Sequence, residues 1–186
     1  IVTEGVSSDD LLIGDKNAVM VAARILAYGG EYAVTLNNPE SGDKFQHSFD
    51  LTSLPFKELP NDVDYSNNSF ELELPISKVL ITFKLLTGSD ETSITDELKS
   101  LKKIGQNAEV TTRLKRVITS VNGDDSKSTI NNFVENMLSK ESLFLRDEIS
   151  RINPDIELSQ DVEIEGETVS LEIPMTVEFF WPKAGK

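Results

Sequence analysis

The chain has 186 residues, of which 38% are hydrophobic and 27% charged, and its formal net charge at pH 7 is −14. A chain of this length can bury on the order of 70% of its unfolded surface, which suffices for one domain or two small ones. The negative charge repels phosphate backbones, so we expect no nucleic-acid partner, whereas basic protein surfaces are compatible with it. No apolar run approaches the roughly 18 residues of a membrane span, so no membrane partner is expected. The absence of Cys excludes disulfides and thiolate zinc sites.

Residues 1–30 are predicted to be a linker followed by one amphipathic helix. Residue 1 is Ile rather than Met, which indicates a processed chain or a fragment, and we favour the fragment. Asp15 is the expected N-cap, and Gly29 with Gly30 supplies the left-handed stop. The residues expected to face the core recur at helical spacing and are Val19, Ala22, Ala23 and Leu26.

Residues 31–88 are predicted to be rich in β-structure. Apolar residues alternate with polar ones from 31 to 50 around a turn at Asn38 to Gly42, which predicts a β-hairpin. Residues 51–68 are rich in Pro, Asp and Asn and indicate an irregular segment. Two further strands are expected at 69–74 and 78–86, on either side of Pro75.

Residues 89–153 are predicted to be helical. Helices are expected from about 88 to 103, from 110 to 117, from an N-cap at Ser128, and from an N-cap at Ser139 to a stop at Pro154. Residues 117–121 have two interpretations, the end of a helix or a strand that enters a turn at Asn122 and Gly123.

Residues 154–186 are predicted to form a second hairpin, with its turn near 163–166, and an aromatic C-terminal strand. Aromatic residues at a chain end are unusual unless they are docked. We expect Val177, Phe179 and Trp181 to continue the strand alternation on one face and close the core, with Phe180 facing a neighbour. The candidate structural or interface residues are Phe179, Phe180, Trp181 and Pro182.

The order of elements predicts an α+β fold, because strands at both ends of the chain flank a group of helices. It comprises two hairpins brought together from the N- and C-terminal parts, an additional strand pair and a cluster of short amphipathic helices. The four consecutive parts, 1–30, 31–88, 89–153 and 154–186, are expected to form one or two compact units.

Catalytic motifs are missing from the sequence. The single His, His47, is interpreted as an ordinary half-exposed strand residue, and the Asp pairs at 9–10 and 124–125 as turn and helix-start residues. No phosphate loop, nucleophile elbow or His-Glu-x-x-His sequence occurs. We therefore expect no enzyme, no cofactor and no metal site; a carboxylate-based hydrolase is a distant alternative.

The tips of the two hairpins share a spacing. Each is a polar run closed by Gly, which is the spacing of a Cys-x-x-Cys-Gly zinc knuckle, and two such knuckles would make a four-ligand site. The other interpretation is two unrelated polar turns. The residues at the four ligand positions are Asn38, Ser41, Val162 and Glu165.

Most of the chain resembles the T4-type bacteriophage baseplate protein family, whose members are baseplate hub or hub-assembly proteins of contractile tails. The order and spacing of several segments carry this resemblance. They are DDLLIGDKNAVMVAARILAYG at 9–29, LLTGSDE at 85–91, FVENM at 133–137, LR at 145–146, INPDI at 152–156, and IPM at 173–175 followed by FFWP at 179–182.

The resemblance implies both a fold and a function. Many relatives carry Cys-x-x-Cys-Gly at both knuckles, and this chain lacks all four cysteines. We therefore expect a degenerate zinc-ribbon-like pair of hairpins that binds no stoichiometric zinc. The family usually has a further N-terminal segment, which agrees with the interpretation of this chain as a fragment.

The implied function is that of a structural virion component of the tail baseplate, at or near the hub, assembled in the host bacterial cytoplasm. The implied partners are other baseplate, hub or tape-measure proteins, in a symmetric assembly of several copies. The alternative is a hub-assembly chaperone that is absent from the mature virion.

Overall fold

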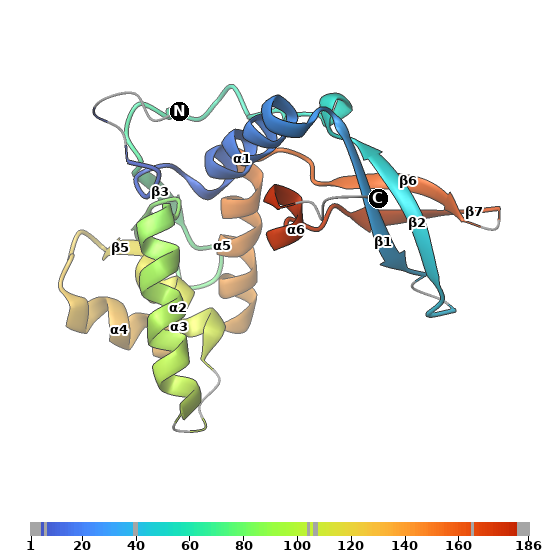
Figure 1. Ribbon diagram of the computed structural model, residues 1–186. Coiled ribbons are helices and arrows are strands. Elements are labelled where there is room, and N and C mark those ends of the chain that lie inside the picture. The colour runs from blue at the N-terminus through green and yellow to red at the C-terminus, as the bar shows by residue number, and fades with distance from the viewer. Residues whose placement is uncertain are drawn as a thin grey trace. The chain divides into compact units, whose positions relative to one another are not determined.

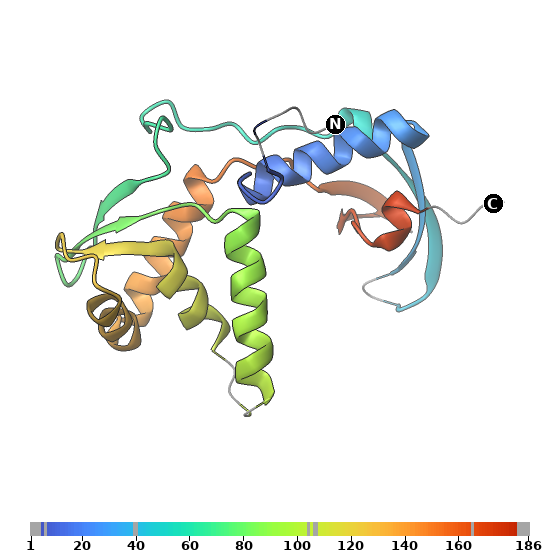
Figure 2. The same ribbon diagram turned by 60° about the vertical axis from the view of Figure 1, so that its left-hand side comes forward.

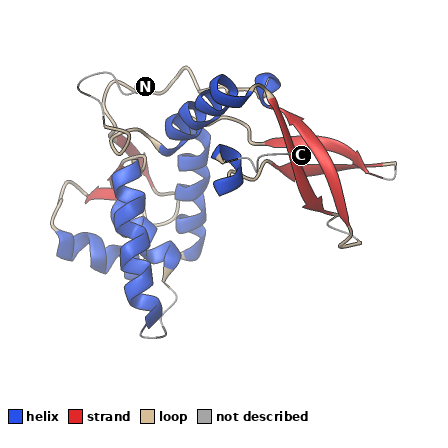
Figure 3. Cartoon of the chain, viewed as in Figure 1, coloured by secondary structure: helices blue, strands red, loops and turns tan. Residues whose placement is uncertain are grey.

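The computed structural model describes residues 5, 7–38, 41–103, 105, 108–164 and 166–181. The described residues form helices and three small antiparallel sheets, which confirms the predicted α+β class (Figure 1, Figure 3). The chain divides into two compact units. The first unit combines residues 1–16 with 58–154, and the second combines residues 17–57 with 155–186. Each unit is therefore built from two segments that are distant in the sequence, rather than from consecutive parts.

Helix α1 (Ile13–Tyr28) begins in the first unit and continues into the second. Its end is the predicted one: Gly29 has φ +87°, in the left-handed region, and its N–H donates to the Ile25 carbonyl at 2.8 Å. Its start differs from the prediction. The helix begins at Ile13, so Asp15 lies in the first turn rather than at the cap, where its charge still complements the helix dipole.

The first unit contains the three-stranded sheet. Strands β3 (Phe70–Glu73), β4 (Leu80–Phe83) and β5 (Ile118–Val121) pair antiparallel in the order β3-β4-β5. The strand interpretation of residues 117–121 is thus the one that holds. Asn122 and Gly123 follow with φ values of +50° and +83°, the left-handed pair of a tight turn.

Four helices complete the first unit, as predicted. They are α2 (Gly88–Lys103), α3 (Glu109–Val117), α4 (Lys127–Asn136) and α5 (Ser139–Ile152). Figures 1 and 2 show α2 and α3 side by side. The sheet and the apolar faces of α3, α4 and α5 enclose one core, whose fully buried members include Leu74, Ile81, Phe83, Leu85, Leu145 and Ile152.

Two predicted N-caps in the first unit are wrong. The residue before α4 is Ser126, whose hydroxyl accepts the Thr129 N–H, so Ser128 lies within the helix. The cap position of α5 is occupied by Leu138, and Ser139 is the first helical residue. At the start of α4, Ser126 and Ser128 offer similar capping chemistry, and the local sequence does not rank them. At the start of α5, the cap position has no side-chain hydrogen bond.

The second unit contains both hairpins. Strand β1 (Glu31–Asn37) pairs with β2 (Lys44–Asp50), which the short 3-10 helix η1 (Leu51–Ser53) follows. Strand β6 (Ser159–Ile164) pairs with β7 (Glu167–Glu172). Both hairpins were expected from the alternation of apolar and polar residues, and both occur within a few residues of the predicted bounds.

One hydrophobic core joins the two hairpins. Hairpin β1–β2 contributes Tyr32 and Phe49, hairpin β6–β7 contributes Leu171, and α1 contributes Val21, all of them buried. A two-stranded hairpin is marginally stable on its own. Apolar packing between segments more than 100 residues apart therefore holds the second unit together, as expected for a chain without cysteines.

Candidate functional site

The aromatic C-terminal segment is a helix, not the predicted strand. Strand β7 ends at Glu172, and the Pro174 that follows has no N–H with which to continue a ladder. Helix α6 (Val177–Phe180) then forms, with the Phe179 N–H donating to the Thr176 carbonyl at 3.0 Å and the Trp181 N–H to the Val177 carbonyl at 2.9 Å.

This change of period reverses the predicted roles of the aromatic residues. Residues four apart share one face of a helix, so Val177 and Trp181 point the same way, and their exposed fractions are 78% and 77%. Phe179 is 0% exposed and closes the core in place of Trp181. Phe180 is half-buried and stacks edge-on against Phe179 at 5.0 Å, so it is not the outward-facing residue. Pro182 lies outside the described residues.

Arg24 is a buried charge that the sequence analysis missed. Its exposed fraction is 5%, and its guanidinium carbon lies 4.8 Å from the ring centre of Tyr28, 5.6 Å from that of Tyr32 and 5.9 Å from that of Phe179. Its terminal nitrogens donate to the carbonyls of Gly29 at 3.3 Å and Glu31 at 3.4 Å. Within the described part of the chain its Nε has no hydrogen-bond partner. Arg24 therefore ties α1 and β1 to α6 through cation–π contacts.

Tyr32 adds a second tie to the same segment. Its hydroxyl donates to the Pro174 carbonyl at 3.0 Å, and its ring packs edge-on against Phe179 at 4.9 Å. Burial raises the pKa of the Tyr32 hydroxyl. Phe179 is thus held by α1 and β1, while Val177 and Trp181 stay available on the opposite side of the short helix.

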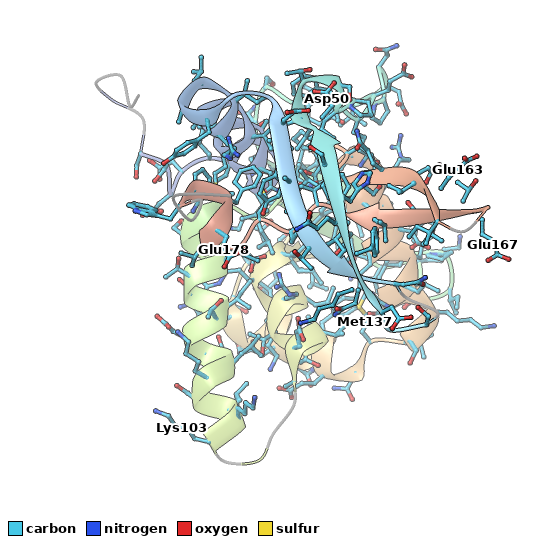
Figure 4. All side chains as sticks on the ribbon, turned by 45° about the vertical axis from the view of Figure 1, so that its right-hand side comes forward. Asp50, Lys103, Met137, Glu163, Glu167 and Glu178 are labelled. Atoms are coloured by element: carbon cyan, nitrogen blue, oxygen red, sulfur yellow. The ribbon has the colours of Figure 1, made fainter. Side chains whose placement is uncertain are left out.

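The outward face of the second hairpin is acidic. The sequence between Ile152 and Lys183 has eight acidic residues and no Lys or Arg. Strand alternation turns Asp161, Glu163 and Glu172 outward, opposite hydroxyl residues of the partner strand. Figure 4 shows Glu163 and Glu167 extending from the tip. Among the described residues none of these four carboxylates forms an ion pair, so their charges are not compensated.

The proposed knuckle positions differ from one another. Asn38 closes its own turn, since its side-chain oxygen accepts the Ser41 N–H at 3.4 Å and its carbonyl accepts the Gly42 N–H at 2.8 Å. Val162 pairs with Val169 and packs against the core of the second unit. Glu165 lies outside the described residues, so its approach to Ser41 stays a prediction.

Two other residues singled out from the sequence, His47 and Asp124, make contacts within the second and the first unit, respectively. His47 lies on the same face of β2 as Phe45 and Phe49, half-buried, with its ring 4.6 Å from that of Phe49. The Asp124 carboxylate accepts the Ser126 N–H at 2.8 Å and the Thr129 hydroxyl at 2.7 Å, which lowers its pKa and makes it a helix-start residue as expected.

The first unit holds a buried carboxylate that the sequence did not indicate. Glu141 of α5 is buried, and its Oε1 accepts the N–H groups of Ile76 at 3.2 Å and Ser77 at 2.6 Å, which fastens the β3–β4 turn. Its partners lie more than 60 residues away, so no local pattern could have found it. In the ranges that the structure describes, no three His, Cys, Asp or Glu side chains are placed to hold a metal ion.

Comparisons with known proteins find no relative of this chain. No protein-family model, no curated protein and no solved structure matches the chain. None of the described helices is both long and apolar enough to cross a membrane.

Proposed function

We propose that this chain is a structural or assembly component of a contractile bacteriophage tail baseplate, at or near the hub, which acts through protein–protein contacts. The resemblance of its segments to the T4-type baseplate protein family motivates the proposal. Its partners would be other baseplate, hub or tape-measure proteins, and it would be present in several copies of a symmetric assembly.

The observation that carries the contact mechanism is the exposed pair Val177 and Trp181 on α6. A large aromatic side chain that is open to solvent but held on a rigid, buried base is the usual form of a binding hot spot. Phe179, Arg24 and Tyr32 supply that base. The acidic outward face of the second hairpin would steer basic partners and add specificity rather than affinity.

Two segments that carry the resemblance also meet in the first unit. The Ser89 N–H donates to the Asp9 carbonyl at 2.9 Å, and the Gly88 N–H donates to the Leu11 carbonyl at 3.0 Å. A Cβ on Gly88 would lie 3.2 Å from the Asp9 Cα, so only glycine fits there without displacing the backbone. Segments 9–29 and 85–91 therefore contact each other in the folded chain. This contact supports treating the two segments together as one mark of the resemblance.

Quantitative mass spectrometry of purified phage particles tests the proposal. A baseplate component is expected at a constant ratio to the other tail proteins, and Trp181→Ala should reduce that ratio. Absence from mature particles, together with co-purification with hub proteins from infected cells, would instead support the assembly chaperone. Absence from both, or clearing of peptidoglycan by the purified protein in a zymogram, would overturn the proposal.

A further inference from the structure

Helix α1 is apolar on two opposite sides. Between Asn17 and Tyr28 its single charged residue is Arg24, which is buried. One side of the helix, centred on Val21, faces the core of the second unit. The other side carries an apolar strip, which we call the outward strip and which consists of Val19, Ala22, Ala23 and Leu26. Ala23 is half-buried and the other three are exposed, so the prediction that these residues face the core is wrong.

The outward strip is well exposed and has the spacing of a helix-binding face. Leu26 is 78% exposed and Val19 51%. Positions i, i+3, i+4 and i+7 lie along one line on a helix, and the two alanines at its centre would let a second helix approach closely. A surface helix normally carries charged or polar residues on its solvent side. An uncharged apolar line of two turns on so acidic a chain indicates a partner.

Charge argues against a second copy of this chain as that partner. Two copies would bring together net charges of −14 each. The partner is therefore a different protein.

Acidic residues at the two ends of the strip indicate that the partner is basic there. Asp15 lies four residues before Val19 on the same helix face and is exposed. Beyond the C-terminal end of the helix, exposed Glu31 and Asp50 lie opposite each other in the β1–β2 pair. The last turn of α1 has no basic residue. Two cations lie nearby: Lys16, whose Nζ lies close to Gly88 in the first unit, and the buried Arg24, whose guanidinium donates to the carbonyls of Gly29 and Glu31.

We propose that the outward strip of α1 binds an amphipathic helix of another protein, whose apolar face is flanked by Lys or Arg. Apolar contact would supply the affinity, and the acids at each end would set the position of the partner helix along α1. This inference does not depend on the baseplate assignment.

The test uses the full chain and two synthetic peptides of about 18 residues, roughly five helical turns. One peptide has a Leu face flanked by Lys, and the other has the same charge with Ser in place of Leu. Binding is followed by the fluorescence anisotropy of a label on each peptide. The site variant is Val19→Ser/Leu26→Ser, and the matched control is Val110→Ser/Leu143→Ser, two exposed apolar residues of the first unit.

The Leu–Lys peptide is expected to bind about tenfold more tightly than the Ser–Lys peptide, and the site variant to lose about the same factor. The matched control should bind like the wild type, and Asp15→Asn/Glu31→Gln should weaken binding a few-fold and reduce its salt dependence.

Each of the opposite results would overturn the inference. Equal affinity for the two peptides would mean that only the peptide charge contributes to binding. Equal losses of affinity in the site variant and its control would place the binding site elsewhere. A melting temperature of the site variant well below that of the matched control, which carries the same loss of helix propensity, would mean that the strip is covered within the chain. A dimer in sedimentation equilibrium that the site variant dissociates would make a second copy the occupant.

Discussion

At the scale of single residues, the C-terminal segment separates a core aromatic from a surface aromatic within three positions. Phe179 is fully buried among Tyr32, Arg24 and Phe180, whereas Trp181 is mostly exposed on the other side of α6. The two aromatic side chains are therefore expected to differ in how much they contribute to stability.

Phe179→Ala is expected to lower the free energy of unfolding by about 3–5 kcal/mol, because it removes a buried ring and leaves a cavity. Trp181→Ala should change it by less than about 1 kcal/mol, since surface substitutions rarely cost more. Urea denaturation followed by circular dichroism measures both. A loss for Trp181→Ala as large as that for Phe179→Ala would contradict the assignment of Trp181 to the surface.

At the scale of the elements, an ion pair joins Asp90, at the start of α2, to Lys84, the residue that follows β4. Asp90 accepts from Lys84 Nζ at 2.7 and 2.8 Å and from the Thr87 N–H at 3.2 Å. Burial alone would raise the pKa of Asp90, but the bonds from Lys84 and Thr87 outweigh it, so the pKa lies below its ordinary value. The ionised carboxylate is therefore the form that stabilises the folded state.

Asp90→Asn is expected to lower the melting temperature at pH 7. A lowered pKa contributes stability above the unfolded value of about 3.9 and loses it as pH falls through the folded pKa. The difference between variant and wild type should therefore begin to shrink below about pH 4, the unfolded pKa, and be lost as the pH falls through the lower folded pKa of Asp90. Asp96→Asn, in an exposed pair with Lys99, is the control and should have little effect. A difference that does not change with pH would show that the ion pair is not its cause.

At the scale of the whole molecule, the two units differ in how they are assembled. Most of the first unit is the continuous segment 58–154, which carries the sheet, four helices and a complete core. The second unit depends on two segments, because each hairpin covers its apolar face with residues from the other. A single cut therefore cannot release the second unit intact.

The isolated segment 58–154 is expected to keep a helical circular dichroism spectrum and to melt cooperatively, because its core lies within it. The isolated segment 155–186 should be unfolded, since a lone two-stranded hairpin is marginal in water. A random-coil spectrum for 58–154 would contradict this division of the chain.

Local patterns predicted most elements correctly. Period-two alternation identified both hairpins, and helical spacing with flanking Gly and Pro identified α1 to α5. These predictions succeed because hydrogen bonds within a helix or a hairpin involve residues close in sequence. Residues 117–121 stayed ambiguous because a short apolar run suits either state, and pairing with β4 decided for the strand.

The sequence by itself determined the α+β class, the positions of the hairpins and of helices α1 to α5, the acidic surface and the lack of thiolate ligands. Only the tertiary structure decided which side of α1 is buried, since both sides are apolar and periodicity cannot rank them. It also placed Arg24 beneath α6 and left Trp181 outside the core. Each of these outcomes depends on contacts between residues far apart in the chain, which no local window of the sequence contains.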